Sequence, residues 1–142
     1  MTTTVPDLVG TRWAGRAELW LDPLGDEAQI SDCALAVHES AIEYTWSHEG
    51  AEQRGSLGLT PPGARFTDTF HASEPMECVA RPDAWGLVDV LGTYGPPDRP
   101  PWGWRIQLSL RPTDELVLQM TNITPWGEEG RAVRMVGARV PS

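Results

Sequence analysis

Three histidines, His38, His48 and His71, are the side chains of this chain best suited to proton transfer or metal binding. Their spacing contains no HxH or HExxH pattern and no Cys/His cluster, so we predict no metal site. His71 follows Asp68 closely and lies near a predicted turn, which makes it either a ligand contact or a rim residue. His38 and His48 each stand beside a glutamate, which indicates solvated positions.

Two carboxylates, Asp68 and Asp89, each fall between large apolar residues in an alternating pattern: Phe66 and Phe70, and Leu87 and Leu91. If these faces point inward, both carboxylates are buried. A buried carboxylate must be paired or protonated, and a shifted pKa makes it a usable acid or base. The alternative is a structural ion pair with an arginine such as Arg105 or Arg134. The candidate catalytic residues are therefore Asp68, His71 and Asp89.

Composition bounds the class of protein. The 142 residues, 40% of them hydrophobic, fit one folded domain, with residues 1–8 as an N-terminal extension. The net charge of −9 argues against binding to nucleic acid or to an anionic membrane. No apolar run approaches a membrane span, and the N-terminus lacks the pattern of a signal peptide. Cys33 and Cys78 form no CxxC pair, and both are expected as small buried residues in a reducing cytoplasm.

Period-two alternation of apolar and polar residues dominates the chain, and proline or glycine interrupts it at short intervals. No segment carries an apolar stripe of helical length, and the nearest candidate, residues 32–44, has room for a turn of helix. The alternation predicts ten strands, at about 11–22, 28–38, 41–48, 52–60, 64–71, 76–80, 85–94, 102–111, 115–124 and 130–140.

Ten short strands joined by short turns are typical of a meander sandwich or a barrel. Closure removes the unpaired edges that an open sheet would have to protect. We therefore predict an all-β fold, an up-and-down antiparallel β-barrel of about ten strands with little helix. A barrel of this strand number has room for a ligand inside.

Large or polar side chains on the predicted inward faces are the expected ligand contacts. The alternative for the apolar ones is plain core packing, and the alternative for the asparagine is a hydrogen bond to a neighbouring group. The predicted ligand-binding residues are Tyr44, Trp46, Phe70, Trp104, Met120 and Asn122.

The stretch Gly10-Thr11-Arg12-Trp13 resembles the Gly-x-Trp start of the calycins, the superfamily that includes lipocalins and fatty-acid-binding proteins. The resemblance implies that Trp13 closes one end of the barrel and that an arginine of the last strand packs over it. Arg139 is placed to be that arginine, and Arg134 is its competitor.

Four further stretches resemble small bacterial lipocalin-like proteins of unknown function, the DUF1579-type group. This resemblance implies a fold and no activity. Nitrobindin-type haem barrels are related, but their iron ligand is a histidine near the C-terminus, and this chain has none after His71. No cofactor is therefore expected. The four stretches are 66–71, 102–106, 120–125 and 132–139.

Three functions follow as hypotheses. The first is a module that binds a small, largely hydrophobic molecule inside the barrel. The second is an enzyme on the same barrel, of the isomerase or cyclase type, acting on a hydrophobic substrate, for example in secondary metabolism; Asp68, His71 or Asp89 would be its acid or base. The third is an interaction protein that uses the proline-rich loop 96–101 with Trp102. A homodimer is a further possibility for the assembly of the chain. The fold alone does not choose among the three functions.

Overall fold

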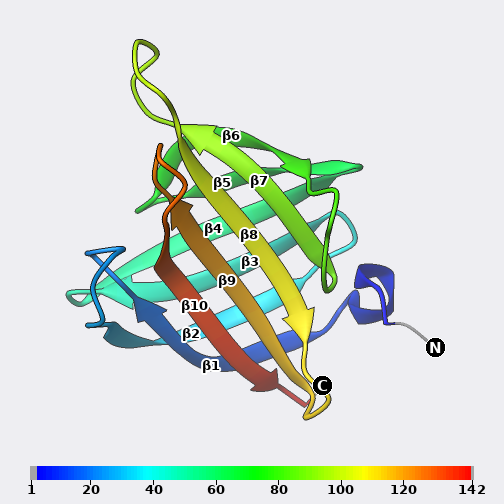
Figure 1. Cartoon of the computed structure of the whole chain (residues 1–142). Coiled ribbons are helices and arrows are strands. Elements are labelled where there is room, and N and C mark those ends of the chain that lie inside the picture. Colours follow the sequence, from blue (N-terminus) through cyan, green and yellow to red (C-terminus); the bar gives the residue numbers. More distant parts are fainter. Residues whose placement is uncertain (1–2, 142) are drawn as a thin grey trace.

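The computed structural model describes residues 3–141, which form a closed barrel of ten antiparallel strands (Figure 1). Each strand pairs with its neighbours along the chain, and β1 pairs with β10 to close the barrel. The predicted up-and-down barrel is confirmed. The elements are a 3₁₀ turn, η1 (Val5–Leu8), and the strands β1 (Arg12–Leu19), β2 (Gln29–Val37), β3 (Ala41–His48), β4 (Ala51–Thr60), β5 (Gly63–Asp68), β6 (Ala72–Ala80), β7 (Val88–Tyr94), β8 (Trp102–Leu110), β9 (Glu115–Ile123) and β10 (Glu129–Arg139).

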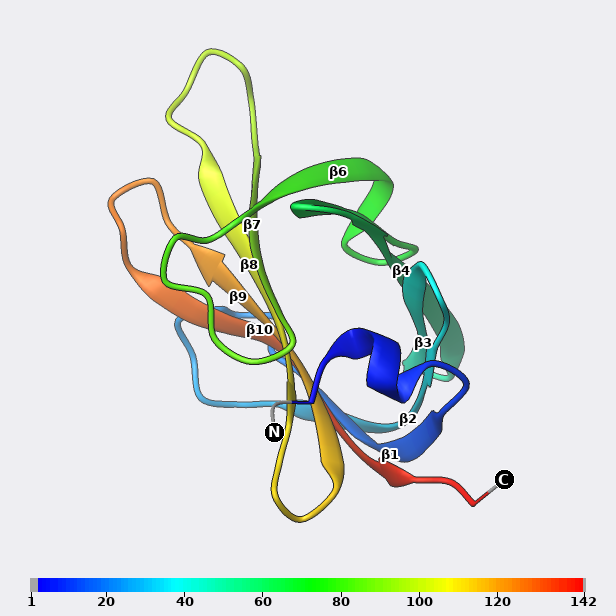
Figure 2. The same cartoon turned by 90° about the vertical axis from the view of Figure 1, so that its right-hand side faces the viewer.

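The helical turn lies before the first strand and not in the segment 32–44, which forms β2 and the start of β3. Val5 and Leu8 are buried in the core, so most of the expected extension is packed structure; residues 1–2 lie outside the described part. Figure 2 shows η1 in front of one opening of the barrel. Within residues 3–141, no helix has the length and apolarity needed to cross a membrane.

The middle of the barrel is filled by its own side chains. If a space large enough for a water molecule lay beside one of these side chains, part of that side chain would be accessible to solvent. The central residues are only 0–1% exposed, so no such space lies beside them. Open room is therefore confined to the barrel ends and to gaps between strands. The central residues are Phe66, Ile106, Leu108, Leu116, Leu118, Met120 and Met135.

The shortest pairing lies between β6 and β7, which share only the residue pairs Val79–Leu91 and Ala80–Val90. Beyond these pairs the two strands are held by side chains. A Cβ on Gly92 would lie 2.4 Å from the Met76 sulfur, so the Met76 side chain packs against the bare backbone of this glycine. The start of β6 and the end of β7 are therefore not paired through their backbones.

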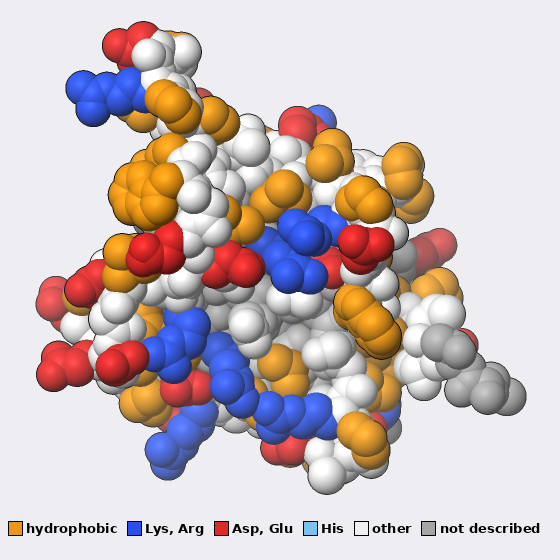
Figure 3. All heavy atoms as spheres, viewed as in Figure 1, with side chains coloured by type: hydrophobic (Ala, Val, Ile, Leu, Met, Phe, Trp, Pro, Cys, Tyr) orange, Lys and Arg blue, Asp and Glu red, His pale blue; other side chains and the backbone are white. Residues whose placement is uncertain are grey.

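Charged side chains cover the outer face. All 11 basic residues are arginines, and on the face shown in Figure 3 they lie among acidic side chains across the strands. Several arginine side chains form a row across the lower half of this view, with acidic side chains beside it (Figure 3).

Candidate functional site

Tyr44, Gly55 and Asp68 form one row across three neighbouring strands, because Gly55 of β4 is the register partner of both Tyr44 on β3 and Asp68 on β5. A Cβ on Gly55 would lie 2.1 Å from the Tyr44 ring and hydroxyl, so the phenol ring lies directly across the glycine. The Tyr44 hydroxyl reaches beyond it and donates a hydrogen bond to Asp68 Oδ2 at 2.5 Å. The Tyr44 ring can therefore reach Asp68 because residue 55, which lies between them, has no side chain.

Asp68 ends β5 and shapes the turn that follows. Its Oδ1 accepts hydrogen bonds from the backbone N–H groups of Phe70 and His71, at 2.7 and 2.8 Å. This is the local bond by which aspartate stabilises turns. The His71 Nδ1 atom lies 3.3 Å from the same oxygen, and Ala72 resumes pairing opposite Asp68. The turn thus places the His71 ring against a buried carboxylate.

The Asp68 side chain is only 1% exposed. Burial raises its pKa, but hydrogen bonds from His71 and Tyr44 and the charge of His71 outweigh burial, so the pKa of Asp68 is lowered. Burial, and next the negative charge of Asp68, raise the pKa of the Tyr44 hydroxyl. Tyr44 therefore remains a donor at neutral pH, and Asp68 remains a carboxylate that stabilises positive charge on the His71 ring.

The His71 ring lies between two indoles. Its centroid is 5.7 Å from that of Trp46 and 5.1 Å from that of Trp104, with interplanar angles of 24° and 38°. Phe70 adds an edge contact to Trp46 at 5.3 Å. In the described part of the chain, the buried indole nitrogens of Trp46 and Trp104 have no hydrogen-bond partner. Each such donor costs about 1–3 kcal/mol, a cost that phenylalanine would avoid in a purely structural cluster.

His71 also lines a cavity of about 580 Å³, which we call the His71 cavity. This volume is within the range of small-molecule sites. The cavity lies along the unpaired part of the β6–β7 seam. Its charged lining residues are Glu74 and Glu77, and Glu77 pairs with Arg65 at 2.6 Å. The remaining lining is Ala72, Ser73, Pro75, Met76, Thr93 and Tyr94.

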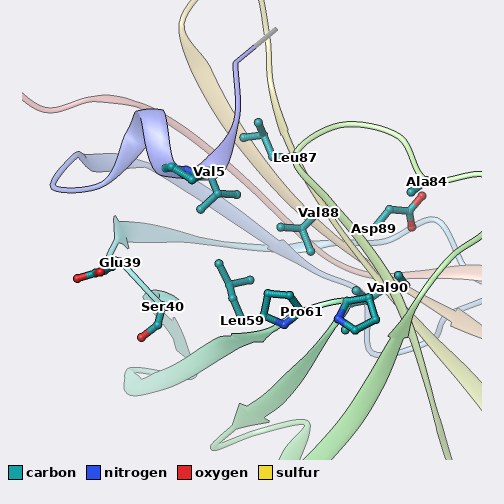
Figure 4. Close-up of a pocket in the computed structure, with 14 residues that line it drawn as sticks. Val5, Glu39, Ser40, Leu59, Pro61, Ala84, Leu87, Val88, Asp89 and Val90 are labelled. Atoms are coloured by element: carbon teal, nitrogen blue, oxygen red, sulfur yellow. The ribbon is translucent and has the colours of Figure 1, made fainter.

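A second cavity, the η1 cavity, occupies about 730 Å³ at the opposite end of the barrel, where β7 begins rather than ends. Figure 4 shows Val5 of η1, Leu59 and Pro61 near the β4–β5 turn, and Leu87 and Val88 around it. Its lining is mostly apolar. None of the six predicted ligand-binding residues lines this cavity, and none lines the His71 cavity.

The structure brings together most of the predicted site residues at the His71 end. Met120 instead packs in the filled middle of the barrel. Asn122 is at the same end as the cluster and accepts a hydrogen bond from the Tyr94 hydroxyl. Tyr94 was not among the predicted residues, although it continues the inward alternation of Val88 and Val90. The residues brought together are Tyr44, Trp46, Asp68, Phe70, His71 and Trp104.

Asp89 forms the ion pair that was the alternative to a second inward carboxylate. Val90 packs in the core opposite Ile106, so Asp89 points to the other face of β7. Arg105 donates two hydrogen bonds to it, at 3.0 and 2.8 Å. Burial raises the pKa of Asp89, but these bonds outweigh burial and lower it. Asp89 and Arg105 therefore form a structural ion pair.

Among residues 3–141, no three His, Cys, Asp or Glu side chains are grouped so that they could hold a metal ion. No protein-family model matches the chain, and neither a curated protein nor a solved structure is detectably similar to it. The functional argument therefore depends on the geometry of the site.

Proposed function

We propose that this protein binds a small, ring-bearing, largely hydrophobic molecule at the His71 end of the barrel. One observation carries the proposal: His71, bonded to the buried carboxylate of Asp68 and flanked by two indoles, lines a cavity of about 580 Å³. A fixed histidine, two hydroxyl groups and an aromatic ring around one cavity can orient and hold a small molecule.

The lining defines the class of ligand. Tyr94 is 39% exposed and offers aromatic surface to a ring. Ser73 and Thr93 supply hydroxyl groups for a polar substituent. Because Glu74 and Glu77 are on the wall and no arginine is, an anionic ligand is disfavoured. The ligand we propose is therefore neutral, unlike a fatty acid.

We further propose that the chain is a calycin of the small lipocalin-like type. The Gly-x-Trp start at Gly10 to Trp13 supports this, together with the closed ten-stranded barrel and the stacking of Arg139 on Trp13. The filled middle distinguishes this barrel from one that carries its ligand in a wide lumen.

Two dyes that share one scaffold test the binding proposal. N-phenyl-1-naphthylamine is neutral, and 8-anilino-1-naphthalenesulfonate carries one negative charge. We expect saturable fluorescence with the neutral dye, and about fivefold or more weaker binding of the sulfonate, because a like charge ~4 Å away costs about 1 kcal/mol in water.

Two alanine variants locate the dye. Tyr94→Ala in the His71 cavity should weaken binding of the neutral dye, whereas Leu87→Ala in the η1 cavity should leave it unchanged. The reverse result would place the ligand in the η1 cavity and contradict the proposal. Absence of saturable binding to the wild type would contradict it as well.

A further inference from the structure

We infer that His71 is a general base that moves a proton on a neutral carbonyl compound bound in the His71 cavity. This inference rests on the proposed binding function and adds a reaction to it. Histidine is the most common group in this role, and an aspartate behind it is the usual means of holding the ring in one orientation.

The orientation of the ring supports this role. The hydrogen bonds of His71 run from its backbone N–H and from Nδ1, and both go to Asp68 Oδ1. A proton on Nδ1 therefore faces the carboxylate, and the lone pair of the neutral ring is on Nε2. Asp68 is itself fixed by the Tyr44 hydroxyl and by two backbone N–H groups. Such a supported base keeps its geometry during a reaction.

The neighbours of His71 narrow the reaction class. Acyl transfer and hydrolysis need an activated nucleophile beside the base. Within residues 3–141 the His71 ring is hydrogen-bonded to Asp68, and no hydroxyl or thiol is hydrogen-bonded to the ring. A proton shift needs only one base that both takes and returns a proton. Carbon acids beside a carbonyl are the substrates for which this suffices.

The step balances without a co-reactant. The Nε2 lone pair takes a proton from the carbon beside the carbonyl, and the C–H electrons form an enolate whose charge is on oxygen. The Asp68 carboxylate stabilises the resulting imidazolium. Nε2–H then returns the proton to the same carbon, or to the far carbon of a β,γ-unsaturated ketone, and the C=O bond forms again. The Ser73 and Thr93 hydroxyls are donors on the same wall for the carbonyl oxygen.

The test is hydrogen–deuterium exchange of 2-indanone in deuterated buffer, followed by proton NMR. We expect the wild type to accelerate exchange of the protons beside the carbonyl by about 100-fold or more, in a manner that saturates with ketone. His71→Gln should return the rate to that of buffer. His38→Gln is the matched control, because His38 is 53% exposed and pairs with Glu43 on the outside; it should exchange as the wild type does.

Asp68 is a positioning residue, and saturation kinetics separate its role from a structural one. In Asp68→Asn the maximal exchange rate at saturating 2-indanone should fall about tenfold or more, because the His71 ring is no longer held by the carboxylate. The ketone concentration at half-saturation should stay near that of the wild type, because the cavity lining is unchanged. The titratable groups that face His71 from the packed elements are Asp68, Tyr44, His48, Glu74, Glu77 and Tyr94.

The outcomes are distinguishable. Saturable binding of N-phenyl-1-naphthylamine with exchange at the buffer rate would overturn proton transfer and leave the binding function in place. Loss of both would overturn both. If His71→Gln does not fold, the wild type decides alone: acceleration that does not saturate with ketone overturns the inference.

Discussion

The guanidinium of Arg139 lies over the indole of Trp13, with its Cζ 4.6 Å from the ring centroid. The two residues are register partners on β10 and β1, the strands that close the barrel. Arg139 also donates two hydrogen bonds to Asp114, both at 2.9 Å, which hold the planar group in its stacked position. Arg134, the competing candidate, is the register partner of Glu18 instead.

A double-mutant cycle of Trp13→Phe and Arg139→Lys should show coupling in the free energy of unfolding. Because the Arg139 side chain is 39% exposed, we expect about 0.5–1 kcal/mol, the range of a cation–π pair near the surface. Lysine cannot stack as a plane, so it retains only part of the contact. Urea unfolding of the four proteins measures the coupling, and strict additivity would show that the pair contributes nothing.

Gly55→Ala should disrupt the contact between Tyr44 and Asp68. The new Cβ would lie 2.1 Å from the Tyr44 ring, so the ring must move and the buried carboxylate loses a donor. The loss should destabilise the protein by about 1–3 kcal/mol in urea unfolding. Gly58→Ala on the same strand is the control, because its Cβ would meet its nearest atom at an ordinary 3.6 Å. Equal effects at the two positions would contradict the role assigned to Gly55.

Stability should depend on pH through Asp68. Its pKa is lower in the folded state than the value of about 3.9 in unfolded chains. The stabilisation is therefore present above pH ~4 and is lost as pH falls through the folded pKa. In urea unfolding, the gap in stability between wild type and Asp68→Asn should be constant near neutral pH and shrink in acid. A gap that widens in acid would mean that the pKa is raised.

The two cysteines should be unreactive in the folded protein. Burial is the main cause that raises the pKa of Cys33 and of Cys78 to about 11, and both are free and buried. The reactive thiolate is thus scarce at pH 8. Labelling with 5,5′-dithiobis(2-nitrobenzoate) should be slow without denaturant and fast in concentrated urea. Fast labelling of the native protein would show that one thiol is accessible.

Alternation was sufficient to predict the barrel, because each strand buries one face and the turns contain proline or glycine. The contact between Tyr44 and Asp68 was beyond sequence reasoning, since it needs the register of three strands at Gly55. A glycine inside a strand does signal a close approach, but not which side chain makes it. The direction of Asp89 could not be predicted because both faces of its strand carry apolar residues, and only pairing with β8 places Val90 opposite Ile106 in the core.

Asp89→Asn should lower stability and leave the His71 end unchanged. Asp89 is 4% exposed, and its partner Arg105 has a side chain that is 19% exposed, so the substitution leaves a largely buried guanidinium without its counter-charge. Breaking such a pair costs about 3–5 kcal/mol when it is fully buried, and we expect about 2–3 kcal/mol here. Urea unfolding measures this loss, and binding of N-phenyl-1-naphthylamine by the folded variant should equal that of the wild type. Asp89 lies at the edge of the η1 cavity beside Ala84 (Figure 4). A variant with full stability and weakened dye binding would therefore show that Asp89 contacts the ligand.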